Sequence, residues 1–458
     1  MSDQLTSINP ATGETIKTYT QHSQEEALAL AAKTHSAFQQ WRRTDFATRA
    51  TRLEKMADLL EQRKTELAAI ITGEMGKVKK EAVGEIEKCA WVCRYYAENG
   101  AALLKDEAKA ADADKAYVTY QPLGVVLAVM PWNFPFWQVF RFAVPTLMAG
   151  NGALLKHAAN VSGCALAIEK LFKGAGFPED IFNTLLIDKE KVKPVIESPS
   201  IHAVTLTGST GAGRAVAAQA GAALKPCVLE LGGSDPYIIL EDADIKEAAK
   251  TCAASRMLNA GQSCIAAKRF IVVDSVHDDF VAGLKSELGA KTMGDPMDDN
   301  TNYGPQAEIR LRDALHSQVE ASIAKGAQCL MGGELPSKKG AWYPATLLTD
   351  VKEGMPAYHE EMFGPVASVI KVKDRAEAIK VANDSDFGLG GAVFTSDIAE
   401  GERIAREEIN SGSVAVNDFV KSDPRLPFGG VKDSGFGREL SAEGIRAFTN
   451  VKTVCVQG

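Results

Sequence analysis

The 458-residue sequence is poor in the features that mark several whole classes of protein. Its eight cysteines are too few and too irregularly spaced for a disulfide framework, and with seven scattered histidines they form no metal-ligand cluster. No apolar run approaches the roughly 18 residues of a membrane span. The net charge of −8 disfavours a nucleic-acid surface or a polybasic membrane patch. We therefore expect a globular protein without a metal, a nucleic-acid partner or a membrane.

The composition of the chain is that of an ordinary folded protein. It is 45% hydrophobic and 24% charged, and its length predicts two or three domains. The opening segment, MSDQLTSINPATGET, lacks the basic-then-apolar order of a signal peptide. We therefore expect a cytoplasmic location.

Hydrophobic periodicity predicts helices first and then an alternation of strands and helices. Ser23 and Glu26 form a capping box before the first of three helical stretches, which fill about the first hundred residues and contain no pattern that indicates chemistry. The expected strands that follow lie at 115–130, 152–156, 182–187, 202–207 and 226–231, with helices at 137–149, 160–175 and 211–223. This alternation predicts a parallel sheet, which binds ligands beyond the carboxyl ends of its strands.

A second α/β alternation begins after the segment LGGSDP at 231–236, with helices expected at 243–258 and 276–289. We therefore place a domain boundary near Gly233. The tail at 449–458 has the pattern of one more strand, and such a strand needs a partner.

Four short segments carry candidate chemistry, and the first is MPWNFPFWQVF at 130–140. Its two prolines fix the backbone directly after an apolar strand. Asn133 between them is either an ordinary turn residue or a rigid amide donor that stabilises a developing oxyanion.

The second segment, LTGSTGAGRAVAA at 206–218, runs from a strand through a glycine-rich turn into a helix. The start of such a helix offers free N–H groups and a positive dipole end to a phosphate. Gly208 and Ser209 are the candidate contacts, although a glycine-rich turn alone is weak evidence.

The third and fourth segments are VLELGGSDP at 228–236 and NAGQSCIAAKRF at 259–270. Glu230 in an apolar strand is either paired structurally or held at a raised pKa as a general base. Cys264 is either a small core residue or a thiolate nucleophile. No histidine accompanies it, so Glu230 is the expected proton acceptor.

Together the motifs PWNFP, LTGS, ELGG, GQSC, EEMFGP (360–365) and PFGGVKDSGFGRE (427–439) resemble the NAD(P)-dependent aldehyde dehydrogenase superfamily. They occur in the order and at roughly the spacing of that family, over nearly the whole chain. Within it, LLKHA and ELGGSDP are most similar to the short bacterial succinate-semialdehyde dehydrogenases.

The resemblance implies a role for particular residues. Cys264 matches the nucleophile, Asn133 the oxyanion donor, and Glu230 the base that activates the thiol or the hydrolytic water. The positions that match cofactor contacts are Trp132, Lys156, Ala159, Gly208, Ser209, Glu361 and Phe363. Ala159 stands where many NAD-specific members have a glutamate that repels a 2′-phosphate, so either NAD or NADP is expected as the cofactor.

The resemblance also implies the fold, a Rossmann-like cofactor domain plus an α/β catalytic domain with a small β oligomerisation extension. The implied cofactor domain is discontinuous, comprising 1–104 and 123–232, and the catalytic domain is 233–440. The extension comprises 105–122 and 441–458 and is expected to build a homodimer or homotetramer.

The implied reaction is oxidation of a small-molecule aldehyde, succinic semialdehyde, to succinate through a cysteine hemithioacetal and a thioester. The alternative is an enzyme for a broader range of aliphatic or aromatic aldehydes. The expected contacts to the substrate carboxylate are Arg141, Lys421, Ser422 and Arg425. For Arg141, a surface or interface ion pair is an equal alternative.

Overall fold

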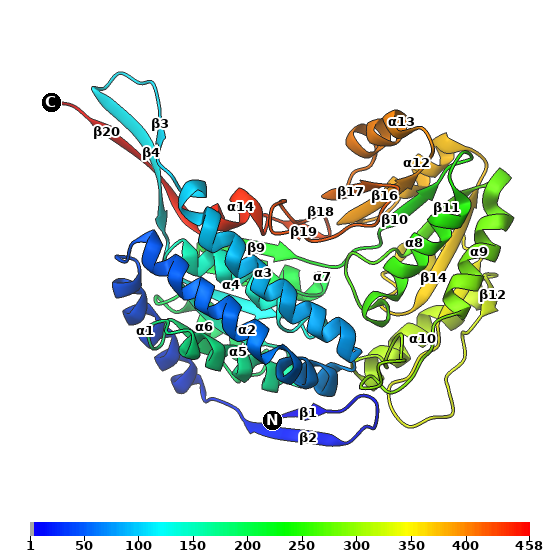
Figure 1. The fold of residues 1–458 in the computed structure, drawn as a ribbon, viewed down its shortest axis with the longest axis horizontal. Coiled ribbons are helices and arrows are strands. Elements are labelled where there is room, and N and C mark those ends of the chain that lie inside the picture. The colour runs from blue at the N-terminus through cyan, green and yellow to red at the C-terminus, as the bar shows by residue number, and fades with distance from the viewer. Residues whose placement is uncertain (1–3) are drawn as a thin grey trace.

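The computed structural model describes residues 4–458, which form two α/β bodies and a projecting β arm (Figure 1). The first body is built on a six-stranded sheet in the order β19-β9-β8-β5-β6-β7. Neighbours from β9 to β7 are parallel, and β19 joins antiparallel. These strands are β5 (Val125–Met130), β6 (Gly152–His157), β7 (Phe182–Thr184), β8 (Ala203–Thr207), β9 (Cys227–Glu230) and β19 (Gly435–Phe436).

Helices cover both faces of this sheet, as the sequence predicts for parallel strands. They are α1 (Gln24–Trp41), α2 (Phe46–Met75), α3 (Lys79–Leu103), α4 (Trp137–Met148), η1 (Ala159–Val161), α5 (Ser162–Gly174), α6 (Val192–Glu197), α7 (Thr210–Ala222) and α14 (Ser441–Arg446). The capping box of Ser23 and Glu26 is confirmed at α1. All residues of α4 are buried, including the polar Gln138, Arg141 and Thr146 among its apolar side chains.

The second body contains a seven-stranded sheet in the order β12-β13-β14-β11-β10-β16-β17, parallel except for β12. Its strands are β10 (Pro236–Ile239), β11 (Arg269–Val273), β12 (Gln328–Met331), β13 (Thr346–Thr349), β14 (Val366–Val372), β16 (Gly390–Phe394) and β17 (Ser413–Val416). Its helices are α8 (Ile245–Met257), η2 (Leu258–Gly261), η3 (Asp274–Val276), α9 (His277–Gly289), α10 (Ile309–Ala324), α11 (Pro356–His359), α12 (Arg375–Asn383), α13 (Ile398–Arg403) and η4 (Ile404–Glu408). A short ladder pairs β15 (Phe387–Gly388) with β18 (Val431–Lys432).

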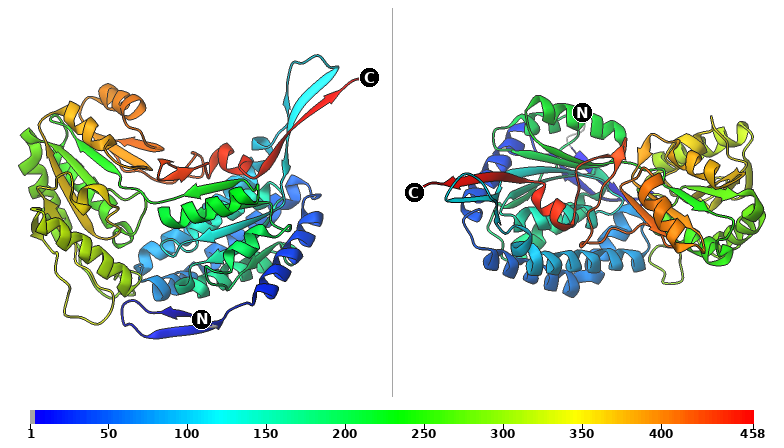
Figure 2. Two further views of the ribbon diagram at one scale, coloured as in Figure 1. Left: turned by 180° about the vertical axis from the view of Figure 1, so that it is seen from behind. Right: turned by 90° about the horizontal axis from the view of Figure 1, so that it is seen from above.

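The terminal strand predicted from the sequence is present as β20 (Thr449–Val456). It pairs antiparallel with β4 (Lys115–Pro122), which also pairs with β3 (Glu107–Ala108). This arm projects away from both bodies, with the C-terminus at its tip (Figures 1 and 2). β20 is an edge strand whose Val451 is 61% exposed.

An N-terminal hairpin of β1 (Gln4–Ile8) and β2 (Thr15–Thr20) precedes the helices and was not expected from the sequence. Most of β2 is exposed, so it lacks the apolar alternation that identifies a strand. Among the helices of residues 4–458, none has the length and apolarity needed to cross a membrane.

Strand register in the first sheet brings the candidate segments to one edge. Met130 of β5 lies opposite His157 of β6, and Val129 lies opposite Leu206 of β8. Glu230 of β9 lies opposite Thr207. The segments that follow these strands therefore emerge side by side at their carboxyl ends, as the sequence predicts.

Candidate active site

Cys264 lies in a turn between η2 and β11 that other side chains hold in place. Just before it, Asn259 and Ala260 adopt left-handed conformations with φ of 54° and 53°, which are unfavourable for non-glycine residues. Glu81 of α3 accepts the backbone N–H of Asn259 at 3.0 Å. Lys268 Nζ donates to the Cys264 carbonyl oxygen at 2.7 Å. The sulfur is thus presented by a strained turn that two charged side chains tie down.

Asn133 is fixed against this same turn. Its Nδ2 donates to the carbonyl of Gln262 at 3.1 Å, and Asn259 Nδ2 donates to the Asn133 carbonyl at 2.8 Å. An amide nitrogen carries two protons, so one remains for a further acceptor. Asn133 and Cys264 line one cavity of about 380 Å³. The structure therefore brings together the predicted nucleophile and the predicted oxyanion donor.

Glu230 ends β9 and is 2% exposed. Neither of its carboxyl oxygens has a hydrogen-bond partner within the described chain. Burial, followed by the nearby Glu439 carboxyl, raises its pKa well above the ordinary value, and the Arg141 charge opposes that rise. Glu230 itself does not line the cavity, but the two residues that follow it do. We use the name reaction centre for Asn133, Glu230 and Cys264, the three predicted catalytic residues.

The charge state of the cysteine follows from its surroundings. Burial raises the pKa of the Cys264 thiol to about 12, while Arg141 and Lys268 act in the opposite direction. The resting sulfur is therefore protonated at neutral pH and needs a proton acceptor before it can act as a nucleophile. Glu230 is a carboxyl of raised pKa suited to that task.

Most of the predicted cofactor residues surround the same cavity. Those in its lining are Trp132, Gly208, Ser209, Glu361 and Phe363. The rings of Trp132 and Phe363 meet edge to face at 5.8 Å. Ser209 is the N-cap of α7, so the first turn of that helix begins at the cavity wall.

Lys156 and Ala159 lie outside this lining, at the carboxyl end of β6. Burial lowers the pKa of the Lys156 ammonium, which forms no ion pair within residues 4–458. Ala159 is exposed at the start of η1. An unpaired cation, a helix N-terminus and an aromatic pair along one sheet edge fit an anionic ligand with flat rings, as a dinucleotide is.

We use the name substrate mouth for Arg141, Lys421, Ser422 and Arg425, the predicted carboxylate contacts. Arg141 forms an ion pair with Glu439, and its guanidinium lies over the Phe428 ring at 4.5 Å. The side chain of Arg141 is 2% exposed. This pair is internal to the chain, whereas the alternative expected from the sequence was a pair at a surface or an interface.

The other members of the substrate mouth differ in exposure. Lys421 and Arg425 are exposed, and each contacts an acid of its own loop at 2.6 Å, Asp418 and Asp423 respectively. Ser422 is buried between them and accepts hydrogen bonds from other elements. These positions leave the predicted substrate role of each residue untested.

The model of the aldehyde dehydrogenase family matches residues 1–454. The chain belongs to this family. The family confirms the fold that the sequence motifs predict. It also confirms the predicted enzyme class, an oxidoreductase that acts on aldehydes.

Several members of the family are similar to this chain over nearly their whole length. The chain is 50% identical over 452 residues to a probable NADP(+) succinate-semialdehyde dehydrogenase of Synechocystis, covering 99% of each chain. It is 48% identical over 451 residues to the Escherichia coli NAD(P)+ succinate semialdehyde dehydrogenase Sad, covering 98% of this chain and 97% of the other. The crystal structure of the Streptococcus pyogenes succinic semialdehyde dehydrogenase with NADP+ has a TM-score of 0.97 at 36% identity, with 99% and 100% covered.

This aldehyde dehydrogenase also uses residues that the motifs do not reveal. Helix α3, expected to carry no chemistry, provides Glu81, Glu85 and Lys88. Glu85 accepts the N–H groups of Phe136 and Trp137 at 2.8 and 3.0 Å and so fixes the segment after Asn133. Lys88 Nζ donates to Ser422 Oγ at 2.8 Å. Their only sequence signal is an acidic and basic face on a helix, which ordinarily indicates solvent exposure.

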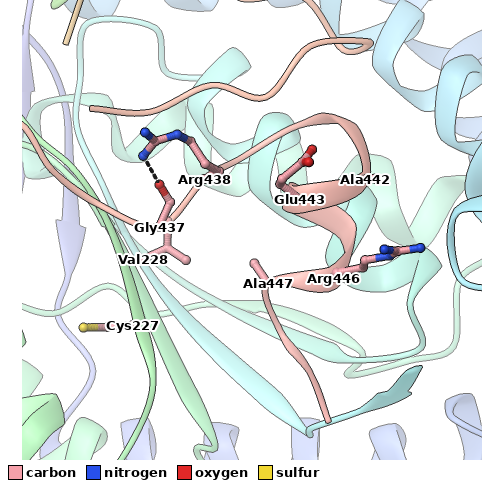
Figure 3. Close-up of a pocket in the computed structure, with 8 residues that line it drawn as sticks. All are labelled: Cys227, Val228, Gly437, Arg438, Ala442, Glu443, Arg446 and Ala447. Carbon is pink, nitrogen blue, oxygen red and sulfur yellow. Dashed lines mark hydrogen bonds between the residues drawn. The ribbon is translucent and has the colours of Figure 1, made fainter. Parts of the chain in front are cut away.

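A larger cavity of this aldehyde dehydrogenase, about 580 Å³, lies elsewhere, between β9 and α14 (Figure 3). Arg438 Nη1 donates to the carbonyls of Gly430 and Gly437 at 2.9 and 2.7 Å. Arg446 Nε donates to the Leu103 carbonyl at 3.0 Å. None of the predicted site residues lines it. Size alone therefore does not identify the active site.

Proposed function

We propose that this aldehyde dehydrogenase oxidises succinic semialdehyde to succinate with NADP or NAD as the acceptor. The observation that carries the substrate assignment is 50% identity, over 99% of both chains, to a relative named for that activity. The second support is chemical: a cysteine and a rigid amide donor line one cavity.

The first catalytic step is addition of the Cys264 sulfur to the aldehyde carbon. A C–S bond forms, the carbonyl π electrons move to oxygen, and the thiol proton passes to the Glu230 carboxylate. The remaining N–H of the Asn133 amide and the backbone N–H of Cys264 stabilise the oxyanion, each typically contributing about 3 kcal/mol. NAD(P), when bound, supplies the hydride acceptor that turns this adduct into a thioester.

The second step releases the acid. Once Glu230 has released the first proton to solvent, it takes a proton from water, and the water oxygen attacks the thioester carbon. The C–S bond then breaks, and the proton held by Glu230 passes to the departing Cys264 sulfur to restore the thiol. Glu230 directly precedes Leu231 and Gly232 of the cavity lining, and its carboxyl oxygens have no hydrogen-bond partner within residues 4–458. The absence of a competing bond leaves its carboxyl free to serve both proton transfers.

For cofactor binding we propose the set predicted from the sequence. Lys156 and Glu361 hold the riboses, and Phe363 packs near the nicotinamide. The phosphate-side contacts are Trp132, Gly208 and Ser209. Ala159 carries no charge beside the adenosine ribose, so a 2′-phosphate is not repelled. The cofactor named for the Synechocystis and E. coli relatives agrees with this proposal.

We propose the domain division expected from the sequence, with 1–104 and 123–232 binding the cofactor, 233–440 catalytic, and 105–122 with 441–458 forming the oligomerisation extension. The exposed edge of β20 supports assembly into a homodimer or homotetramer. Deleting 449–458 is expected to lower the mass measured by light scattering from that of the homodimer or homotetramer toward that of a single chain. Eight free cysteines support a cytoplasmic, reducing location, which cell fractionation tests.

The experiment that tests the function is a steady-state assay at 340 nm with purified protein. We expect kcat/KM for succinic semialdehyde to exceed that for butanal by at least about tenfold, because a bound carboxylate contributes about 1.5–3 kcal/mol. Equal values for the two aldehydes would support the broader enzyme instead.

A further inference from the structure

The cations predicted at the substrate mouth already have acidic partners. The pairs are Arg141–Glu439, Lys421–Asp418 and Arg425–Asp423. A cation bound to a protein carboxylate must give up that partner, or share it, before it binds the carboxylate of a substrate. These three are therefore poorly prepared to recognise an anion.

Lys88 of α3 lies beside them and differs in this respect. It forms no ion pair within residues 4–458, although the Asp423 and Glu85 carboxylates are near enough to favour its charged form. Asp423 is bound by Arg425, and Glu85 is bound by Lys77. Burial lowers the pKa of the Lys88 ammonium to about 8, so it remains largely charged at pH 7. It is a partly desolvated cation without an anion.

Lys88 and Ser422 both have protons left to donate. Ser422 Oγ accepts Lys88 Nζ at 2.8 Å and Trp137 Nε1 at 3.0 Å. A hydroxyl oxygen has two lone pairs, and both are used here, so the hydroxyl proton remains for another acceptor. The ammonium has three protons and directs one to Ser422. Lys88 and Ser422 therefore present two adjacent donors, one for each oxygen of a carboxylate.

The position of Lys88 connects it to the reaction centre. Its Nζ lies 4.3 Å from the centroid of the Trp137 ring, which stabilises the cation by a cation–π contact. Trp137 follows Asn133 by four residues and begins α4, and Arg141 lies one helical turn further. The Arg141 charge lowers the pKa of both Lys88 and the Cys264 thiol. The Arg141 guanidinium therefore lies within electrostatic range of both the ammonium and the sulfur.

We propose that Lys88 is a specificity-determining residue, whose ammonium acts with the Ser422 hydroxyl to bind the distal carboxylate of the substrate. This inference rests on the proposed function and deepens it. Arg141, paired with Glu439, contributes positive potential without releasing its partner. Lys88 thereby selects a short ω-carboxylate semialdehyde over an uncharged aldehyde of the same length.

The test compares K88M, which keeps the length of the side chain and removes its charge, with wild type. We expect kcat/KM for succinic semialdehyde to fall about 10- to 100-fold, mainly through KM, and the value for butanal to stay within twofold. K88R, which keeps the charge, is expected to recover part of the preference. K80M is the matched control, since Lys80 is exposed on the same helix, and it is expected to behave as wild type.

A binding measurement makes the test independent of turnover. Succinate is expected to raise the Tm of wild type and K80M but not of K88M, and K88Q is measured in parallel in case K88M folds poorly. If wild type itself does not prefer succinic semialdehyde to butanal, the proposed function fails. If wild type shows that preference and both folded Lys88 variants retain it, the function stands and the role of Lys88 is overturned.

Discussion

The reaction centre and the substrate mouth hold their charged groups in opposite ways. In the reaction centre Glu230 has no hydrogen-bond partner within the described residues, and the Cys264 thiol is kept neutral by burial. In the substrate mouth Arg141 and Lys421 are each bound by a protein carboxylate. One region keeps its reactive groups free, and the other neutralises most of its charge.

This difference follows from what each region has to do. A base and a nucleophile must exchange protons during turnover, and a strong ionic partner would compete with that exchange. The cations of the substrate mouth exchange no proton, so their pairing stabilises the fold and leaves recognition of the substrate carboxylate to the unpaired Lys88 proposed above. The comparison predicts that changes in the reaction centre affect every aldehyde, whereas changes in the mouth affect stability or the choice of substrate.

The largest effect is expected for Cys264→Ala, which removes the nucleophile. We expect kcat to fall by about 10⁴-fold or more for succinic semialdehyde and butanal alike, because no covalent adduct forms. Cys455→Ala, at an exposed position of β20, is the matched control and should leave kcat unchanged. Substantial turnover by C264A, measured at 340 nm, would remove the basis of the mechanism.

Glu230→Gln is expected to lower steady-state kcat by about 10²- to 10⁴-fold for both aldehydes. Because the pKa of Glu230 and that of Cys264 are both raised, wild-type kcat/KM should increase as pH rises and the two groups lose their protons. In E230Q the part of the pH profile of kcat/KM that reports loss of the Glu230 proton disappears. The part that reports loss of the Cys264 proton remains. Stopped-flow absorbance at 340 nm shows which step Glu230 serves. If E230Q forms one equivalent of reduced cofactor in a burst and then slows, the main role of Glu230 is in thioester hydrolysis. An unchanged pH profile would contradict a role as base.

Arg141→Met is expected to act mainly on stability. It leaves Glu439 buried without its cation, which should lower the free energy of unfolding by about 3 kcal/mol. The double variant R141M/E439Q removes the unpaired charge and should recover at least half of that loss in chemical denaturation. If R141M instead unfolds like wild type and loses only its preference for succinic semialdehyde, Arg141 binds substrate and the comparison breaks.

The sequence predicted the parallel sheet well because its strands are buried on both sides and read as continuous apolar runs. The strand expected at 202–207 is β8 (Ala203–Thr207), and the helix expected at 211–223 is α7 (Thr210–Ala222). The hairpin of β1 and β2 could not be found in this way, since the residues of TIKTYT are mostly exposed and their order carries no alternation.

The site shows the same division between local and tertiary information. Asn133 and Cys264 belong to short motifs whose prolines and small residues dictate a turn, so both were predicted and they line one cavity. Lys88 was missed because it precedes Ser422 by 334 residues, and only the tertiary structure, which sets the loop after β17 against α3, brings their side chains within 2.8 Å. The sequence could not predict the ion-pair partner of Arg141 for the same reason, since Glu439 follows it by 298 residues.

The smallest effect is expected at the cofactor end, where Lys156, like Glu230, has no ionic partner within residues 4–458. Ala159→Glu places a carboxylate at an exposed position of η1, where it repels a 2′-phosphate through water-screened electrostatics of about 1–2 kcal/mol. We expect kcat/KM with NADP to fall about tenfold and that with NAD to stay within about threefold. Ala159→Gln, of equal size and no charge, should leave the NADP value nearly unchanged. The KM for succinic semialdehyde should not move in either variant, because the substrate mouth is a separate region. An equal loss with both cofactors would mean that the side chain blocks the ribose by its bulk, and that charge at this position does not select the cofactor.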